Sequence, residues 1–237
     1  ESADGEPREV YAGNMVGPHA LFARKSSGGG PIVYDISDPT APAFVGDYHE
    51  ADGNGGYIFA HEGFLFVGNS GAGDMYDATD PATITKLARG HLEGDLDTVV
   101  PFGNVAILSV DDEAEDQVAS IVVPWRTEVD ARGPAVARTV PPAGAVGVAT
   151  TARVGIGFDE NIEPITVHAG SLRVSDPDGL PVPGWGSAQE TIAHWVPEVP
   201  LLPQSTYTVE VMAGGITDVN GNPVPETLSF QFTTGVR

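Results

Sequence analysis

A ten-residue phrase occurs twice in this chain, and the spacing of its two copies constrains the fold more than any other feature. VYDISDPTAP occupies residues 33–42, and MYDATDPATI occupies residues 75–84, an offset of 42 residues. Within one copy, Gly, Asn and Asp-Pro turn signals separate four short β-prone runs. Four strands in about 42 residues are typical of one blade of a β-propeller.

Polar turn residues and a tyrosine mark each copy, and elementary chemistry gives them structural roles. Asp38 and Asp80 can accept hydrogen bonds from the backbone N–H groups that follow, and the proline after each fixes φ in the turn. We expect the two tyrosines to pack between neighbouring blades. The markers are Tyr34, Asp35, Asp38 and Pro39 in the first copy and Tyr76, Asp77, Asp80 and Pro81 in the second.

The longer phrase YDISDPTAPAFVGDY resembles the LVIVD-type propeller repeat, in which such an outer-strand phrase follows a hydrophobic strand. The resemblance covers residues 15–98 and continues weakly to Trp125, through a faint third copy that places Asp116 under Asp74. It implies an all-β partial propeller over residues 1–126, with two clear four-stranded blades and a degenerate third.

Closed propellers typically have at least about four blades, so this one needs completion. The missing blades lie in sequence outside this chain, or another chain supplies them, or the blades form an open stack with a protected edge. Because the chain begins with Glu1 and not Met, we expect a processed or excised piece. We favour the first explanation, because the chain starts within a phrase and its best-preserved copies stand at the N-terminal side. Unpaired strand edges then predict association with missing blades or with a further copy.

The second half has a different pattern. Residues 127–132 are expected to be a linker, and about seven strand-like runs over residues 133–237 predict a β-sandwich. PPAGAVGVATTARVGIGFDENIEP, LPQSTYTVEV, ITDVNGNPV and FQFTTG follow in the order of bacterial Ig-like domains of the S-layer-protein (Big_5) type, which they resemble. The resemblance implies a spacer, adhesion module or stalk of a secreted or surface protein, in a group not known for catalysis.

Three aromatic residues in this half have structural interpretations. Tyr207 is expected to form a corner in which its hydroxyl bonds to upstream backbone. Trp185 and Trp195 are expected to be core or sheet-covering residues, with a sugar-binding platform as the alternative.

Charge and composition exclude several functions. The chain has 33 acidic and 11 basic residues, a formal net charge of −22, and no cysteine. Nucleic acid and anionic lipid need clustered Lys or Arg, so we expect neither as a partner. Disulfides and thiolate chemistry are impossible, and no apolar run reaches the roughly 20 residues of a membrane span.

Histidines at the repeat spacing are the main candidates for metal ligands. The offset of 42 residues aligns His19 with His61 and His49 with His91. Equivalent residues of neighbouring blades could converge on the propeller axis, with Glu62 as a further ligand. The alternative is that the repeat copies these histidines as hydrogen-bonding strand or turn residues.

Oxygen-rich segments raise the alternative of Ca²⁺. Asp218, Asn220 and Asn222 have the spacing of a Ca²⁺ loop, but Asn-Gly is also a strong hairpin signal. The acidic loops at residues 49–55 and 111–116 are expected to be solvated, with Ca²⁺ binding as the alternative. No cofactor is predicted, and Ca²⁺ stays open.

The combined interpretation is a non-catalytic structural or adhesive protein, secreted or attached to the cell surface. Propeller blades would supply an interaction surface, and the Ig-like domain would serve as a spacer or assembly module. The alternative is a fragment of a metal-dependent propeller enzyme, an oxidoreductase or hydrolase with histidines near the axis. A third option is an adhesin stiffened by Ca²⁺.

Overall fold

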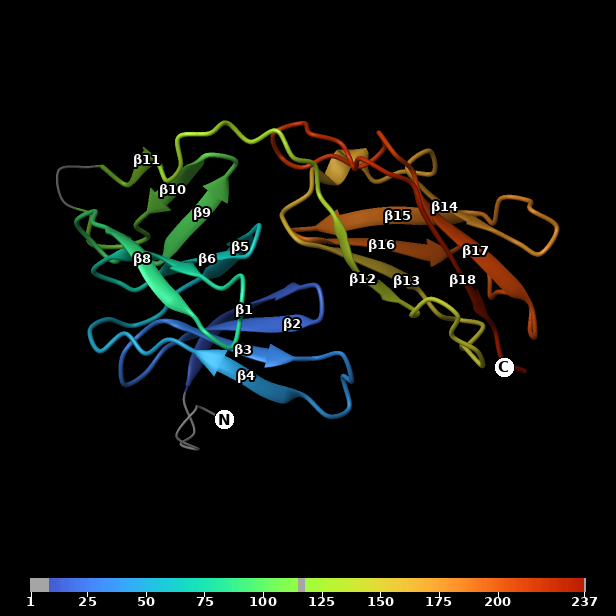
Figure 1. Cartoon of the computed structure of the whole chain (residues 1–237), viewed down its shortest axis with the longest axis horizontal. Helices are drawn as coiled ribbons and strands as arrows, with labels where there is room; N and C mark the ends of the chain where they lie inside the picture. Colours follow the sequence, from blue (N-terminus) through green and yellow to red (C-terminus); the bar gives the residue numbers. More distant parts are fainter. Residues whose placement is uncertain (1–8, 115–117, 237) are drawn as a thin grey trace. The chain divides into compact units, whose positions relative to one another are not determined.

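The computed structural model describes residues 9–114 and 118–236, and the described chain is all-β apart from one short 3₁₀ helix. Asp116 of the faint third copy lies outside the described residues. The chain divides into two compact units, Glu1–Asp130 and Ala131–Arg237 (Figure 1). The division falls within the expected linker at residues 127–132.

The first unit contains three antiparallel sheets, each a simple meander. Two are four-stranded, in the orders β1-β2-β3-β4 and β5-β6-β7-β8, and the third has the order β11-β10-β9. Their strands are β1 (Val10–Val16), β2 (His19–Arg24), β3 (Pro31–Asp35), β4 (Ala43–Asp47), β5 (Ile58–His61), β6 (Phe64–Gly68), β7 (Gly73–Asp77), β8 (Thr85–Gly90), β9 (Thr98–Phe102), β10 (Val105–Ser109) and β11 (Ser120–Pro124).

The sequence repeat is also a structural repeat in the outer half of each four-stranded sheet. Strands β3 and β4 correspond to β7 and β8 at the offset of 42 residues, and the register shifts at the same place, before Tyr34 in one sheet and before Tyr76 in the other. A bulge at an equivalent position is a feature of the fold and not a defect.

The inner half follows a different offset, because one connection is longer. Residues 24–30 lie between the paired residues Ala23 and Pro31, whereas only residues 69–72 lie between Gly68 and Gly73. Consequently β2 corresponds to β6 at an offset of 45 residues, and the ungapped comparison aligns residues that are not equivalent in space.

Apolar clusters join the sheets face to face. Leu21 and Val33 of the first sheet lie in one cluster with Leu65 and Tyr76 of the second. A second cluster joins the opposite face of the second sheet to the third, and it contains Phe66, Leu96, Val99, Ala106, Leu108 and Val110. The alternation of side chains in β6 thus gives that sheet two buried faces.

The Asp-Pro phrases form the expected turns. Asp38 accepts hydrogen bonds from the backbone N–H of Thr40 at 2.9 Å and from its hydroxyl at 2.7 Å. Asp80 accepts from the backbone N–H of Ala82 at 3.1 Å. The predicted capping by the two aspartates is confirmed.

The second unit has two antiparallel sheets, in the orders β12-β13-β16-β15 and β14-β17-β18. One apolar cluster draws residues from both, including Ile156, Trp195, Val209 and Phe232. Its elements are β12 (Val136–Val140), β13 (Val154–Phe158), the 3₁₀ helix η2 (Pro164–Thr166), β14 (Leu172–Ser175), β15 (Gly184–Gln189), β16 (Ile192–Pro197), β17 (Thr206–Val211) and β18 (Leu228–Thr233).

The aromatic residues of this unit fit their expected roles in two cases. The hydroxyl of Tyr207 accepts a hydrogen bond from the backbone N–H of Leu202 at 2.8 Å, so the tyrosine corner is confirmed. Trp195 is buried in the core, whereas Trp185 is 62% exposed and is not a core residue.

Among the described residues, no helix has the length and apolar character needed to cross a bilayer.

Candidate functional site

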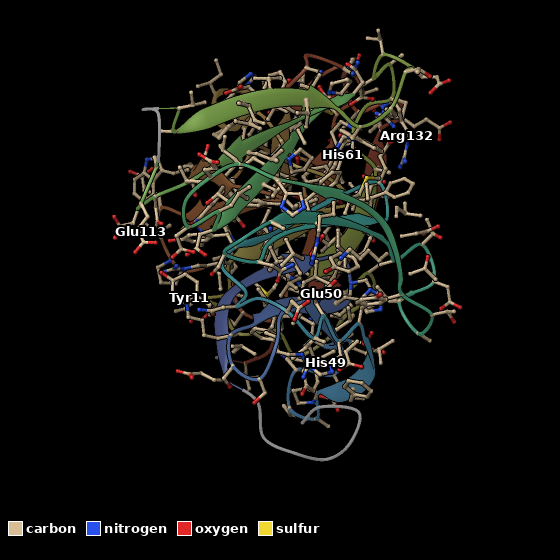
Figure 2. The ribbon with its side chains drawn as sticks, turned by 90° about the vertical axis from the view of Figure 1, so that its left-hand side faces the viewer. Tyr11, His49, Glu50, His61, Glu113 and Arg132 are labelled. Carbon is tan, nitrogen blue, oxygen red and sulfur yellow. The ribbon has the colours of Figure 1, made fainter. Side chains whose placement is uncertain are left out.

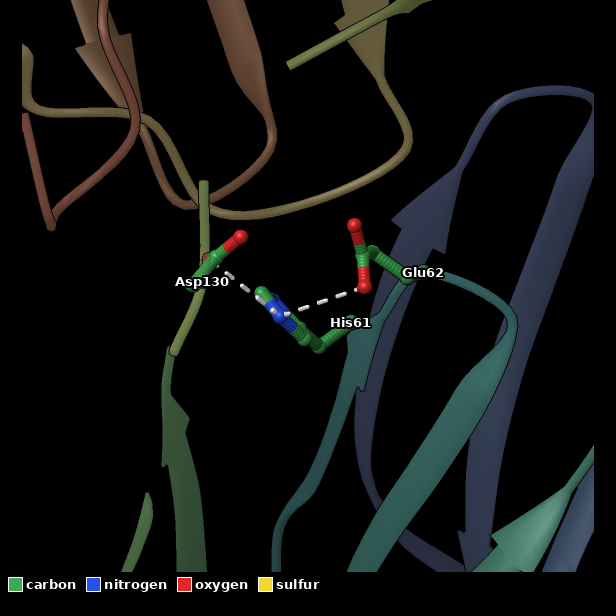
Figure 3. Close-up of side chains that lie close together, drawn as sticks. All are labelled: His61, Glu62 and Asp130. Carbon is green, nitrogen blue, oxygen red and sulfur yellow. Dashed lines mark ion pairs between the residues drawn. The ribbon is translucent and has the colours of Figure 1, made fainter. Parts of the chain in front are cut away.

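One histidine lies with two carboxylates at the end of β5. His61 is the last residue of that strand, and Glu62 and Gly63 form the turn to β6, both with positive φ, 49° and 85°. A two-residue hairpin with this geometry favours glycine at the second position, which the sequence supplies. Asp130 joins them from the segment that follows β11 (Figure 3).

The three side chains are close together and largely removed from water. The Nε2 atom of His61 lies 3.6 Å from Oδ2 of Asp130 and 3.9 Å from Oε2 of Glu62. Side-chain exposure is 4% for His61, 12% for Glu62 and 1% for Asp130. By donor type alone, one imidazole and two carboxylates could ligate a divalent metal.

Arg126 supplies a positive charge to the same three groups. Its guanidinium donates to Oε2 of Glu62 at 2.5 Å, and its Nη2 lies 3.3 Å from Oδ1 of Asp130 and 3.3 Å from Nε2 of His61. A metal bound to the same atoms would have to displace this guanidinium. Charge-assisted hydrogen bonds of this kind are about twice as strong as neutral ones.

Trp125 holds the arginine in place. The guanidinium carbon lies 4.6 Å from the centroid of the Trp125 ring, a cation–π contact. The indole N–H donates to the carbonyl of Gly103 at 2.8 Å, and the ring also contacts Phe64 and Phe66. The arrangement therefore connects the second and third sheets as well as neutralising charge.

The other repeat histidines lie elsewhere. His19 begins β2 and pairs with Asp35, whereas His61 pairs with Phe64 at the opposite side of its hairpin. The spatial counterpart of His61 in the first sheet is Val16, which pairs with His19. His19 and His61 are thus not equivalent. Among the described residues, the group around His61 consists of Glu62 and Asp130 and does not contain His19.

His49 and His91 are equivalent, and both anchor a loop. Nε2 of His49 lies 2.7 Å from the carbonyl of Ser27, and Nδ1 of His91 lies 3.1 Å from the carbonyl of Gly71. Each histidine reaches the loop between the second and third strands of its own sheet. Figure 2 shows His49 well apart from His61, so these two do not share a site.

The proposed Ca²⁺ loop of the second unit is arranged as a closed turn. Asp218 is fully buried, and its carboxylate accepts hydrogen bonds at 2.8 Å from the backbone N–H of Asn220, the backbone N–H of Asn222 and the side-chain amide of Asn222. Three donors on one carboxylate already satisfy much of its hydrogen-bonding capacity. The side chains hold the turn, and whether they also bind Ca²⁺ stays a prediction.

A buried aspartate at the centre of the first unit organises a larger ionic network. Both oxygens of Asp74 accept from Arg89 at 2.7 Å, Lys86 lies 3.1 Å away, and Asn69 donates at 2.8 Å. Burial raises the pKa of Asp74, but hydrogen bonds from Arg89 and Lys86 outweigh it, and the pKa lies below its usual range.

The network also connects two sheets. Lys86 and Arg89, on β8, both pair with Glu50, which follows β4. Asn69 accepts a hydrogen bond at 3.1 Å from the backbone N–H of Gly30, in the connection between β2 and β3 of the first sheet. Asn69, Lys86 and Arg89, which contact Asp74, thus also contact Gly30 or Glu50 in the loops of the first sheet.

Sequence reasoning did not identify Arg126, Asp130 or Asp74 as important. Asp130 fell within the expected linker, and Arg126 is 64 positions from its partner Glu62. The signal that could have found Arg126 is the scarcity of basic residues, 11 against 33 acidic ones. Because few cations are available, each basic residue is a candidate partner for a buried carboxylate.

Comparisons with known proteins bear on the second unit. A search of curated proteins gave no match. Among solved structures, CopC from Methylosinus trichosporium OB3b is similar at 20% identity and a TM-score of 0.35, over 43% of this chain and 93% of that one. This likeness is too distant to carry an argument. The model of the Big_5 family, described as a bacterial Ig-like domain, matches residues 130–234. Residues 130–234 are therefore a bacterial Ig-like domain of the Big_5 family, a domain that occurs in bacterial surface proteins.

Proposed function

We propose that the protein is a non-catalytic structural or adhesive component of a bacterial cell surface or its surroundings. The observation that carries this proposal is the Big_5 Ig-like domain at residues 130–234. In the proposal, this domain is a spacer or assembly module, and the sheets of the first unit supply an interaction surface. A net charge of −22 suits extracellular water rich in salt or divalent cations.

Cell fractionation tests the location. Antibodies against the recombinant chain should label intact source cells, or detect the protein in the culture medium, before the cells are permeabilised. Labelling that requires permeabilisation would overturn the proposed location.

The finer part of the proposal is that the first unit consists of LVIVD-type propeller blades. Two observations support it: both four-stranded sheets are meanders, and the bulge before Tyr34 recurs before Tyr76. Tyr76 is fully buried against the first sheet, with its ring 5.2 Å from that of Tyr48. These are the relations expected between neighbouring blades.

The repeat implies that one face of the first sheet packs against a further sheet. Tyr34, the counterpart of Tyr76, pairs with Phe44 and Ala20, and Ala20 pairs with Met15, so all four share a face. Met15 is 47% exposed and Phe44 is 38% exposed. Leu21 packs from the opposite face. The occupant we propose is a further four-stranded sheet of this repeat, from missing blades or from a second copy.

We expect the recombinant chain to self-associate through this face. Light scattering coupled to gel filtration should show a species heavier than the monomer, and Tyr34→Ser with Phe44→Ser should shift it towards the monomer. Leu180→Ser is the matched control, because Leu180 is 62% exposed but lies in the second unit. A monodisperse monomer at the highest soluble concentration would contradict self-association.

The second candidate function is a metal-dependent enzyme, favoured by the approach of His61, Glu62 and Asp130. The position of Arg126 speaks against it, since the guanidinium contacts all three groups. Metal analysis of the protein purified without added metal decides between the two. Stoichiometric zinc, iron or manganese that is lost in a His61→Ala variant would sink the non-catalytic proposal.

A further inference from the structure

A second group of carboxylates lies in the first unit and is made of residues other than those around His61 and Asp74. Asp95, Asp97 and Asp111 each bring an oxygen within 4.8 Å of the other two. Asp95 and Asp97 precede β9, and Asp111 follows β10. The sheet therefore brings together charges that lie on separate stretches of the chain.

Backbone hydrogen bonds fix the positions of these residues. The N–H of Asp95 donates to the carbonyl of Asp112 at 2.9 Å, and the N–H of Asp111 donates back to the carbonyl of Asp95 at 3.2 Å. The N–H of Asp97 also donates to the carbonyl of Asp95, at 3.0 Å. These bonds fix the main chain at Asp95, Asp97 and Asp111, whose side chains bring their carboxylate oxygens together.

Two glycines fix Asp97 further. A Cβ atom at Gly68 would collide with the carbonyl group of Asp97, and one at Gly56 would collide with both its carbonyl and its carboxylate. The N–H of Tyr57 donates to the same Asp97 carbonyl at 2.8 Å. Asp97 is thus packed directly against Gly56, Tyr57 and Gly68.

Burial makes this arrangement costly without a cation. Asp97 is only 4% exposed, and its Oδ1 atom, like Oδ1 of Asp95, is buried without a hydrogen-bond partner among residues 9–114 and 118–236. Buried ionised groups normally have a partner. Burial first, and then the charges of Asp95 and Asp111, raise the pKa of Asp97. Asp111 is exposed, which leaves a route from solvent.

Lys25 is the basic residue whose charge acts on Asp97, but it does not take the place of a cation among the three carboxylates. It lowers the pKa of Asp97 through its charge, but its ammonium lies 4.5 Å from the centroid of the Tyr11 ring. None of the three carboxylates forms an ion pair with any residue in the described part of the chain. Figure 2 shows Tyr11 on one side of the unit, away from His61.

We infer that Asp95, Asp97 and Asp111 form a Ca²⁺ site. Three carboxylates and no nitrogen or sulfur donor suit a hard cation and not a transition metal. Because Ca²⁺–oxygen distances are about 2.3–2.6 Å, ligands on opposite sides of the ion lie up to about 5 Å apart, so three oxygens within 4.8 Å of one another can share one ion. Mg²⁺ demands a near-ideal octahedron and keeps several of its waters, so it suits a cluster of three carboxylates less well than Ca²⁺ does. Water and backbone carbonyls would complete the coordination of Ca²⁺.

Calorimetry on the full chain, stripped with chelator, tests the site with Ca²⁺ alone as the probe. We expect one Ca²⁺ per chain and a melting temperature that rises with Ca²⁺. Asp97→Asn and Asp111→Asn should each weaken binding by about tenfold or more, because each removes a charged ligand. Asp112→Asn is the matched control, since it removes the same charge from the neighbouring residue and should leave Ca²⁺ binding unchanged.

One further measurement distinguishes a binding site from a structural cluster. Without Ca²⁺, Asp97→Asn should melt at the same temperature as the parent chain or higher, because it removes repulsion between like charges. Asp111 is exposed, so Asp111→Asn keeps the test informative if the Asp97 variant fails to fold. The inference is overturned by an absence of Ca²⁺ binding, by equal binding of Mg²⁺, or by an equal loss in the Asp112 control.

Discussion

Arg126→Ala should lower the free energy of unfolding by about 3–5 kcal/mol, the range found when one partner of a buried ion pair is removed. The guanidinium contacts Glu62, Asp130 and His61, and the side chains of Glu62 and Asp130 are only 12% and 1% exposed. Without Arg126 the two carboxylates lose their cation and repel each other. Urea unfolding at neutral pH measures the loss.

The control for this prediction is Arg132→Ala. The Arg132 side chain is 50% exposed and pairs with Asp159, and exposed pairs contribute only about 0–1 kcal/mol. If the two substitutions cost the same, the first unit does not depend on the arginine in the way the geometry indicates.

The Arg126→Ala variant also tests whether the guanidinium prevents a metal from binding at His61. With the guanidinium removed, Zn²⁺ should raise the melting temperature of Arg126→Ala but not that of the parent chain. The effect should disappear when His61→Ala is added, because the imidazole is the best zinc ligand of the three groups. Zinc stabilisation of the parent chain that depends on His61 would instead favour the metalloenzyme.

Asp74→Ala is expected to cost about 3 kcal/mol, at the lower end of the same range. The side chain of Asp74 is wholly buried, but those of Lys86 and Arg89 are 20% and 28% exposed and keep Glu50 as a partner. Water and Glu50 therefore offset part of the loss. Asp77→Ala, on the same strand but half-buried and hydrogen-bonded to Thr79 of the adjacent turn, should cost only about 1 kcal/mol.

The contribution of Asp74 should also depend on pH in a defined direction. Its pKa is lower in the folded protein than in the unfolded chain, where it is about 3.9. The unfolded chain thus binds the proton more readily, and the stabilisation is complete above that value and lost as the pH falls through the folded pKa. The stability difference between the parent chain and Asp74→Asn should stay constant down to about pH 5 and shrink as the pH falls below about 4. A difference that stays constant over the whole range would contradict the assignment.

Local patterns were enough to predict the all-β class and the turns at Asp38 and Asp80. Alternation and turn chemistry act over a few residues, so a sequence expresses them directly. The register of distant strands is not local. Residues 24–30 outnumber residues 69–72 by three, and this difference moved His61 out of register with His19.

The ionic sites could not be predicted from the sequence, for a related reason. Arg126 and His61 are 65 positions apart, and only the stacking of the sheets brings them together. Asp97 was not singled out, because no phrase around it resembles a known ligand pattern, and its close approach to Gly56 and Gly68 exists only in the folded chain.

The close approach of Gly68 to Asp97 has a consequence for how freely this sequence can vary. In a library in which every position is randomised and folded variants are selected, position 68 should return only glycine, because even a methyl group would meet the Asp97 carbonyl. At Gly71, three residues further on, a Cβ would have nothing within 4 Å, so this position should accept most side chains. Two glycines three residues apart thus differ in the substitutions that they allow: position 68 should accept no other residue, whereas position 71 should accept most.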